Sequence, residues 1–225
     1  MAQPSVSPSP FRPSLTAIEQ PTIYLVDDEP AIRKALARLL RTGGWRVEAF
    51  GSCEEFLHGH DPQATGCIVL DMMLPGLSGE ELQRLLADKR NPLPVIFITG
   101  QGDIPMCARA LKSGAVEFLT KPVDADELFR AVNDAVNRDR ENRRSLTHVA
   151  AINQRLALLT PREREVLGHV VAGKTNKMIA ADLGTVEKTV KVHRGRVMEK
   201  MGANSLAELV RLAAQVGIGT PGLLD

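Results

Sequence analysis

From residue 22 onward, the sequence repeats one pattern five times: a short run rich in β-branched and aromatic residues, then an amphipathic stretch. The short runs read TIYLVDD, WRVEAF, CIVLD, LPVIFIT and AVEFLT. The stretches with helical spacing are 30–42, 52–59, 78–89, 103–113 and the segment from Asp124 onward. Because no hairpin turn joins successive runs, and because IYLV and VIFI are apolar at every position, the pattern predicts an α/β domain. We expect a doubly wound, five-stranded parallel sheet with helices on both faces.

Charge divides the chain into two parts. Residues 22–128 hold 11 basic and 16 acidic side chains, whereas residues 156–213 hold 10 basic and 6 acidic ones. The chain has 225 residues, 44% of them hydrophobic, which is enough for one large or two modest globular domains. The asymmetry predicts two modules with different ligands, of which the second suits a polyanion.

Composition also sets the expected domain boundaries. Residues 1–21 are rich in Pro and Ser and predict a tail without a fixed fold. The α/β module is expected over 22–136, a charged helical linker over 137–155, a helical module over 156–217 and a short tail over 218–225. No apolar run is long enough to cross a bilayer and the N-terminus lacks the layout of a signal peptide, so we expect a cytoplasmic protein without membrane contact.

Polar residues stand at the carboxyl ends of the predicted strands. Asp27 and Asp28 follow the first strand, and Asp71 ends the third. Thr99 ends the fourth strand, and Lys121 follows the fifth. Ligands of doubly wound sheets bind at this edge. Three carboxylates repel one another unless a cation lies among them, and a site with few oxygen ligands suits Mg²⁺. An aspartate beside Mg²⁺ and a lysine predicts phosphoryl transfer, with Asp71 as the nucleophile.

Each of these residues has a plainer interpretation when it is taken alone. The Asp27–Asp28 pair is also typical of an exposed turn, and Asp71 of a cap on the turn that follows it. Thr99 suits any strand, and Lys121 suits any solvated surface. Their joint occurrence at the ends of successive strands is what favours a common site.

Single glycines divide the last sixty or so residues into four predicted helices, which read PREREVLGHVVA, NKMIAADL, VEKTVKVHRGRVMEKM and SLAELVRLAAQV. The residues expected to cap the first three helices are Thr160, Thr175 and Thr185. The short second helix, the turn at Gly184 and the longer third helix have the layout of a helix-turn-helix. The sequence therefore predicts a small all-α, four-helix domain after the linker.

The third of these helices has an apolar stripe and a basic face. Four apolar residues recur at helical spacing and are expected to be buried: Val186, Val190, Val197 and Met201. Four basic residues lie off that stripe, where they could neutralise phosphates or reach base edges of DNA: Lys188, Lys191, Arg194 and Arg196. The start of the preceding helix could grip a phosphate through Thr175, Asn176 and Lys177. A solvated charged face is the plainer interpretation of such a run.

The motifs YLVDDE, VLDMMLPGLSGEEL, VIFITGQGD and AVEFLTKPV resemble the receiver domains of bacterial two-component response regulators. The resemblance covers residues 22–136, and it implies a flavodoxin-like fold. It also implies that Asp71 accepts a phosphoryl group from a sensor histidine kinase. Asp27, Asp28 and Asp71 would hold Mg²⁺, assisted by the main-chain carbonyl of Met73.

The same resemblance implies roles for three further positions. Thr99 and Lys121 would bind the phosphoryl oxygens, and the Lys121–Pro122 peptide would be cis. Phe118 would be the aromatic switch residue, which turns inward when Thr99 moves toward the phosphoryl group. Phe118 is equally expected to be a core aromatic, and one role does not exclude the other.

The segments LTPREREVLGHVVAGKTNKMIAADL and TVEKTVKVHRGRVMEKMGANSLAELVRLA resemble the LuxR-type DNA-binding domain. Together with a receiver they resemble the NarL/FixJ class, and GDIPMCARALKSGA resembles its FixJ-like branch. The resemblance implies a transcription regulator, not an enzyme, that forms a homodimer on phosphorylation and has RNA polymerase as a partner. The positions implied to face double-stranded DNA are Lys188, Thr189, Lys191, Val192, Arg194 and Arg196. Gly195 departs from the larger residue expected inside this helix.

Two other classes of function stay open on sequence alone. A phosphohydrolase of the haloacid dehalogenase type also uses an aspartate with Mg²⁺, but it places a second aspartate where this chain has Met73. A module that binds RNA or protein would also present a basic helix. The chain has only 4% aromatic residues and shows no aromatic stacking platform beside that helix, which argues against single-stranded RNA.

Overall fold

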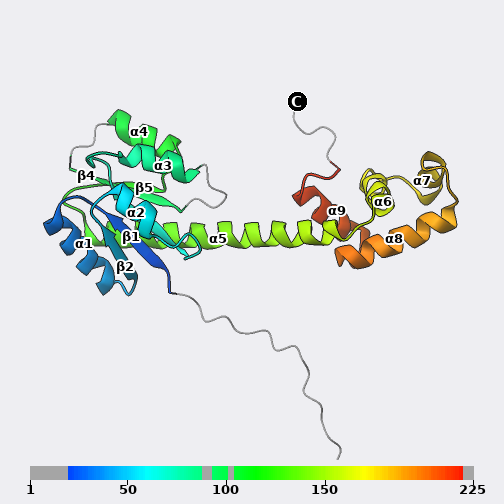
Figure 1. The fold of residues 1–225 in the computed structure, drawn as a ribbon, viewed down its shortest axis with the longest axis horizontal. Coiled ribbons are helices and arrows are strands. Elements are labelled where there is room, and N and C mark those ends of the chain that lie inside the picture. The colour runs from blue at the N-terminus through cyan, green and yellow to red at the C-terminus, as the bar shows by residue number, and fades with distance from the viewer. Residues whose placement is uncertain (1–19, 88–92, 101–103, 220–225) are drawn as a thin grey trace, which may run out of the picture. The chain divides into compact units, whose positions relative to one another are not determined.

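The computed structural model describes residues 20–87, 93–100 and 104–219, and these form two compact units that divide after residue 142. The first unit contains a five-stranded parallel sheet in the order β2-β1-β3-β4-β5. Its strands are β1 (Thr22–Val26), β2 (Arg46–Phe50), β3 (Gly66–Asp71), β4 (Val95–Thr99) and β5 (Glu117–Thr120). Its helices are α1 (Pro30–Thr42), α2 (Cys53–Gly59), α3 (Gly79–Ala87), α4 (Ile104–Lys112) and the first part of α5 (Ala125–Ala157). The predicted doubly wound α/β fold is confirmed (Figure 1).

Alternate residues of the central strands enter two separate cores. On one face of the sheet, Ile23 and Val69 pack with residues of α1 and α5, such as Leu40 and Val132. On the other face, Tyr24, Ile68 and Phe97 pack with residues of α2 and α3, such as Phe56 and Leu82. Since both faces are covered, every position of β1, β3 and β4 is buried, which explains the continuous apolar runs IYLV, CIVL and VIFI in these strands.

The helix α5 runs without a break from Ala125 to Ala157, and the segment 137–155, in which the sequence predicted a helical linker, lies inside it. Asp139 is fully buried, and its Oδ2 accepts a hydrogen bond of 3.0 Å from the main-chain N–H of Gly66 at the start of β3. The packing of α5 on the first unit therefore extends at least to Asp139.

The second unit is helical throughout the described residues. It contains α6 (Pro161–Val171), α7 (Asn176–Asp182), α8 (Glu187–Met201) and α9 (Leu206–Gln215). Two residues from the last turns of α5, Ile152 and Leu156, pack in its core. The other core residues include Val166, Ile179, Val190, Val197 and Leu209, which come from α6 to α9. The predicted caps of the first two helices are confirmed, because the hydroxyls of Thr160 and Thr175 accept hydrogen bonds from the main-chain N–H groups of Glu163 and Met178.

The start of α8 differs from the prediction. Thr185 is not the N-cap of α8, and its main-chain N–H donates to the carbonyl of Ala180 at the end of α7. The N-cap is Val186, which has no side-chain capping hydrogen bond. The side chain of Val186 is 64% exposed, so its place in the predicted buried stripe was wrong, whereas Val190, Val197 and Met201 are fully buried. Because Val186 precedes the helix, its side chain does not follow the helical spacing.

A buried ion pair links α6 to α8. Glu163 is 2% exposed, and its Oε2 accepts 2.6 Å and 2.9 Å hydrogen bonds from Lys200 Nζ and from the N–H of Thr160. The Lys200 hydrogen bond, followed by that of Thr160, lowers the pKa of Glu163 to about 2. Because this pKa is depressed in the folded state, the ion pair stabilises the second unit above about pH 4.5, and the stabilisation is lost as the pH falls toward 2.

We therefore expect Lys200→Met to lower the melting temperature of the second unit at neutral pH and to have progressively less effect in acid. Thermal unfolding of wild type and variant at about pH 3, 5 and 7, followed through amide signals of α6 and α8, measures the difference. A difference that is equal at all three pH values would contradict the depressed pKa of Glu163.

Candidate functional site

The carboxyl edge of the sheet brings three predicted acids together. Val26 pairs with Leu70 in the register of β1 and β3, so Asp27 and Asp71 leave neighbouring strands at the same level. Asp27 is 1% exposed and Asp71 5% exposed, whereas Asp28 is open to solvent. One carboxylate oxygen from each of the three aspartates lies within 4.8 Å of the others. The predicted convergence of these three side chains is confirmed.

Lys121 reaches into this acidic cluster. Its Nζ lies 2.6 Å from Asp71 Oδ2 and 2.9 Å from Asp27 Oδ2. Burial alone would lower the pKa of Lys121, but the hydrogen bonds to Asp71 and Asp27 outweigh it, and the pKa is raised. The lysine is therefore a cation over the physiological range, and it offsets part of the repulsion between the two carboxylates.

The cluster opens to solvent through a pocket of about 520 Å³. The pocket is lined by Asp28, Glu29, Asp71, Met73, Gly100 and Lys121. Asp71 Oδ1 accepts a 3.0 Å hydrogen bond from the N–H of Met73, which fixes the chain just after β3. Three carboxylates that converge on one opening, all with hard oxygen donors, fit a divalent cation such as Mg²⁺.

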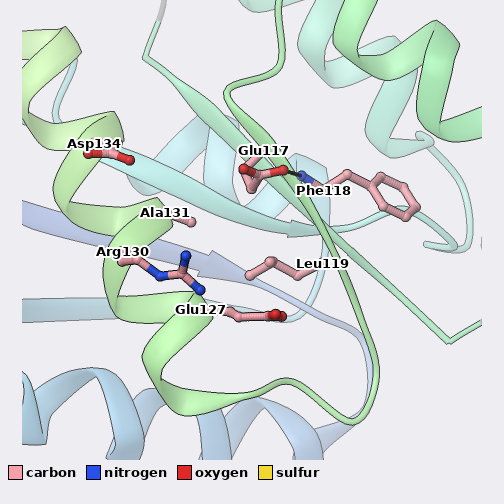
Figure 2. Close-up of a pocket in the computed structure, with 7 residues that line it drawn as sticks. All are labelled: Glu117, Phe118, Leu119, Glu127, Arg130, Ala131 and Asp134. Atoms are coloured by element: carbon pink, nitrogen blue, oxygen red, sulfur yellow. Dashed lines mark hydrogen bonds between the residues drawn. The ribbon is translucent and has the colours of Figure 1, made fainter.

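Thr99 and Phe118 occupy the neighbouring strands. Thr99 is fully buried at the end of β4, and its carbonyl accepts a 2.7 Å hydrogen bond from the N–H of Lys121. The Lys121–Pro122 peptide is cis, as predicted. Phe118 is half-buried on β5 and packs against the core on the α2 and α3 face. Figure 2 shows its ring directed away from the α5 side chains that line the pocket on the other side of β5.

One further acid at this edge, Glu29, was not predicted from the sequence. Glu29 Oε1 lies 3.6 Å from Lys121 Nζ, and Glu29 is both the N-cap of α1 and part of the pocket wall. The only signal in the sequence was a third acidic residue directly after Asp27 and Asp28. A residue in that position is equally typical of a helix start, so only the structure shows that its side chain turns toward the lysine.

The basic residues predicted to face DNA lie on α7 and α8. Four are exposed and so available to a ligand: Lys177, Lys188, Lys191 and Arg196. Val192 is also exposed, at 49%, although it is apolar. Asn176 and Arg194 are half-buried and contact each other, because Arg194 Nη1 donates a 3.1 Å hydrogen bond to Asn176 Oδ1. Thr189 is half-buried, and the hydroxyl of Thr175 accepts the capping bond of α7.

Gly195 lies inside α8, where a Cβ atom would meet nothing within 4 Å. We expect Gly195→Ala to raise the unfolding free energy of the second unit by about 1 kcal/mol, since alanine has the higher helix propensity and costs no space. Gly184→Ala is the matched control and should destabilise the same unit, because Gly184 has a φ of +61°. Urea unfolding measures the change in unfolding free energy of each variant. If Gly195→Ala lowers the unfolding free energy, the position does not have the open space that the structure shows around it.

None of the helices in the described part of the chain combines the length and the hydropathy that a bilayer crossing requires.

Residues 23–133 match the response regulator receiver domain family, and residues 157–213 match the luxR family of bacterial regulatory proteins. Nodulation protein W of Bradyrhizobium diazoefficiens is 47% identical over 196 residues, which are 87% of this chain and 86% of that protein.

Two solved structures extend over both units. The response regulator StyR has a TM-score of 0.77 and 42% identity, with 87% of this chain and 99% of that chain covered. Full-length FixJ from B. japonicum has a TM-score of 0.53 and 39% identity, with 88% and 97% covered. The receiver match spans the acidic edge of the sheet, and the luxR match spans α8 with its basic face. The chain therefore belongs to the DNA-binding two-component response regulators that join a receiver domain to a LuxR-type helix-turn-helix domain, consistent with the NarL/FixJ class.

Proposed function

We propose that this response regulator accepts a phosphoryl group on Asp71 from a sensor histidine kinase, dimerises through its receiver and then regulates transcription from the DNA that α8 binds. The observation that carries the proposal is the placement of Asp71, whose carboxylate is nearly buried, shares Lys121 with Asp27 and still borders an open pocket. A carboxylate with a purely structural role would need an ion pair such as the one with Lys121, but it would not need to border a pocket that is open to solvent.

Asp71 supplies the nucleophile. One of its carboxylate oxygens attacks phosphorus while the bond from phosphorus to the donor nitrogen of the kinase histidine breaks, and the released imidazole is reprotonated. Asp27, Asp28 and Asp71, with the main-chain carbonyl of Met73, would hold Mg²⁺. When bound, the cation would offset the charge on the transferring phosphoryl group. The ammonium of Lys121 is already 2.6 Å from Asp71, so after the transfer it can bind one of the negatively charged phosphoryl oxygens.

The switch is proposed to pass through Thr99 and Phe118. The hydroxyl of Thr99 would bind a phosphoryl oxygen, and the half-buried ring of Phe118 would turn further into the core behind it. This change would reshape the surface of α4 and β5, through which two receivers would pair. Two helix-turn-helix domains would thereby be brought to one operator, where RNA polymerase is the expected partner.

The contact with DNA is proposed to centre on α8. In a helix-turn-helix, the second helix lies in the major groove. Lys191 and Val192 would contact bases, since an ammonium suits guanine acceptors and an exposed apolar side chain suits a thymine methyl group. Lys177, Lys188 and Arg196 would neutralise phosphates. The remaining predicted positions, Thr175, Asn176, Thr189 and Arg194, would support this surface, because Arg194 and Asn176 are joined by a hydrogen bond.

Acetyl phosphate with Mg²⁺ replaces the kinase in the direct test. We expect light scattering to show a monomer that becomes a dimer on addition of the donor, and gel-shift assays to show tighter binding to DNA. The affinity for a random duplex should also fall steeply with salt, which distinguishes DNA backbone binding from a protein partner. A protein that stays monomeric after phosphorylation would contradict the proposed dimerisation.

A further inference from the structure

Two loops border the acidic cluster, and both contact one short segment of the chain. The first loop follows β1 and contains Asp27, and the second follows β3 and contains Met73. Because carboxylates within 4.8 Å of one another repel, the loops need fixed positions if the cluster is to stay assembled without a cation. The segment 50–55, which joins β2 to α2, contacts both of them.

The loop after β3 is held by Glu54, in the first turn of α2. Glu54 Oε1 accepts a 3.3 Å hydrogen bond from the N–H of Leu77, which is 23 residues away in the sequence. A Cβ atom at Gly76, whose φ is +80°, would lie 3.3 Å from the same oxygen. The carboxylate therefore supports the tight turn that ends the loop. Its pKa is lowered by hydrogen bonds from its own N–H, from Ser52 and from Leu77, so it stays charged at neutral pH.

The loop after β1 is fixed by hydrogen bonds to both main-chain groups of Asp27, its N–H and its carbonyl. The N–H of Asp27 donates a 3.2 Å hydrogen bond to the carbonyl of Phe50, and the carbonyl of Asp27 accepts one of 2.5 Å from Arg33 Nη1. Arg33 also borders the turn at Gly51, where a Cβ atom would lie 3.6 Å from its Nη1 and 3.4 Å from Glu55 Oε2. Glu55 closes this turn with a 2.7 Å hydrogen bond from the N–H of Gly51.

We propose that Glu54 and Arg33 are positioning residues, which hold the two loops at the separation that lets the acidic cluster bind a divalent cation. The proposal rests on the proposed function, because it takes Asp27, Asp28 and Asp71 as the ligands of Mg²⁺. A first-turn glutamate that served only the dipole of α2 would have no need to reach Leu77. Groups behind the ligands of a metal site commonly contribute about 10- to 100-fold to metal affinity.

The test is a Mg²⁺ titration of the full chain, followed through amide chemical shifts, on Glu54→Ala and Glu54→Gln. Glutamine keeps the oxygen that accepts from Leu77, whereas alanine removes it. We expect Glu54→Ala to weaken Mg²⁺ binding about tenfold and Glu54→Gln to stay near wild type. Glu80→Ala is the matched control, since it removes a first-turn carboxylate of α3 whose ion pair is with Arg109, and it should leave the affinity unchanged.

The other results overturn the proposal or move its test to Arg33. If Glu54→Ala binds Mg²⁺ as wild type does, the loops do not depend on the carboxylate. If Glu54→Gln is as weak as Glu54→Ala, the charge and not the hydrogen bond is what matters. If Glu54→Ala fails to fold, Arg33→Met and Arg33→Lys form the second pair, and equal affinities in these two variants refute the positioning role. If the wild-type chain itself shows no Mg²⁺-dependent shifts, the proposed function fails as well.

Discussion

Asp71→Asn is expected to abolish phosphorylation by acetyl phosphate, and with it the dimer that the donor induces. An amide oxygen is a weak nucleophile, and the change also removes one of the three charges of the acidic cluster. Because asparagine has nearly the same shape, its side chain can still accept from the N–H of Met73, and the fold should persist. Phosphate-affinity electrophoresis measures the modification, and light scattering measures the mass.

The control for Asp71→Asn is Asp134→Asn. Asp134 is an exposed acid on α5 that borders the pocket in Figure 2, so the variant makes the same chemical change away from the acidic cluster. It should be phosphorylated at the wild-type rate. Removal of Mg²⁺ with a chelator should also stop the reaction in the wild-type chain. If Asp71→Asn still becomes a dimer on addition of the donor, the proposed mechanism is wrong.

Lys191→Ala is expected to weaken binding to a specific DNA site about tenfold or more, since a good base contact contributes about 1–3 kcal/mol. Lys191 is exposed on α8 and lies beside Val192, the other proposed base contact. Loss of a base contact should also relax the preference for one base of the operator. Fluorescence anisotropy with the site, and with versions altered at each position, measures both effects.

Two control variants distinguish side chains that contact bases from side chains that contact phosphates. Arg196→Ala should weaken binding to every sequence alike and lower the slope of log affinity against log salt by about one. Lys34→Ala removes an exposed lysine from α1 in the receiver and should change neither property. If Lys191→Ala lowers the salt slope but leaves the base preference unchanged, Lys191 contacts phosphate and not a base.

Much of the receiver could be predicted from the sequence, because its constraints are local. The run VIFI of β4 is apolar at every position, since both faces of the strand are buried, and that property is visible without a structure. The meeting of Asp27, Asp71 and Lys121 also followed from their places at strand ends, because the carboxyl ends of parallel strands lie on one edge.

The parts that could not be predicted depend on contacts between distant segments. The hydrogen bond from Leu77 to Glu54 joins the loop after β3 to the first turn of α2, and no local pattern reveals that these two segments meet. Val186 has the spacing of a buried stripe, yet it is the N-cap of α8, lies before the first turn and is exposed, while the N–H of the preceding Thr185 donates to Ala180 at the end of α7. Helix starts depend on such hydrogen bonds, which periodicity does not encode.

The most direct measurement is the location of the phosphoryl group after incubation with acetyl phosphate and Mg²⁺. Borohydride reduces an aspartyl phosphate to homoserine, so peptide mass spectrometry of the reduced chain identifies the acceptor. If Asp71 is the phosphoacceptor, the reduced chain contains one homoserine, at position 71, and the Asp71→Asn variant contains none. A phosphoryl group on any other residue, or a chain that is not modified at all, would contradict the claim that Asp71 is the phosphoacceptor.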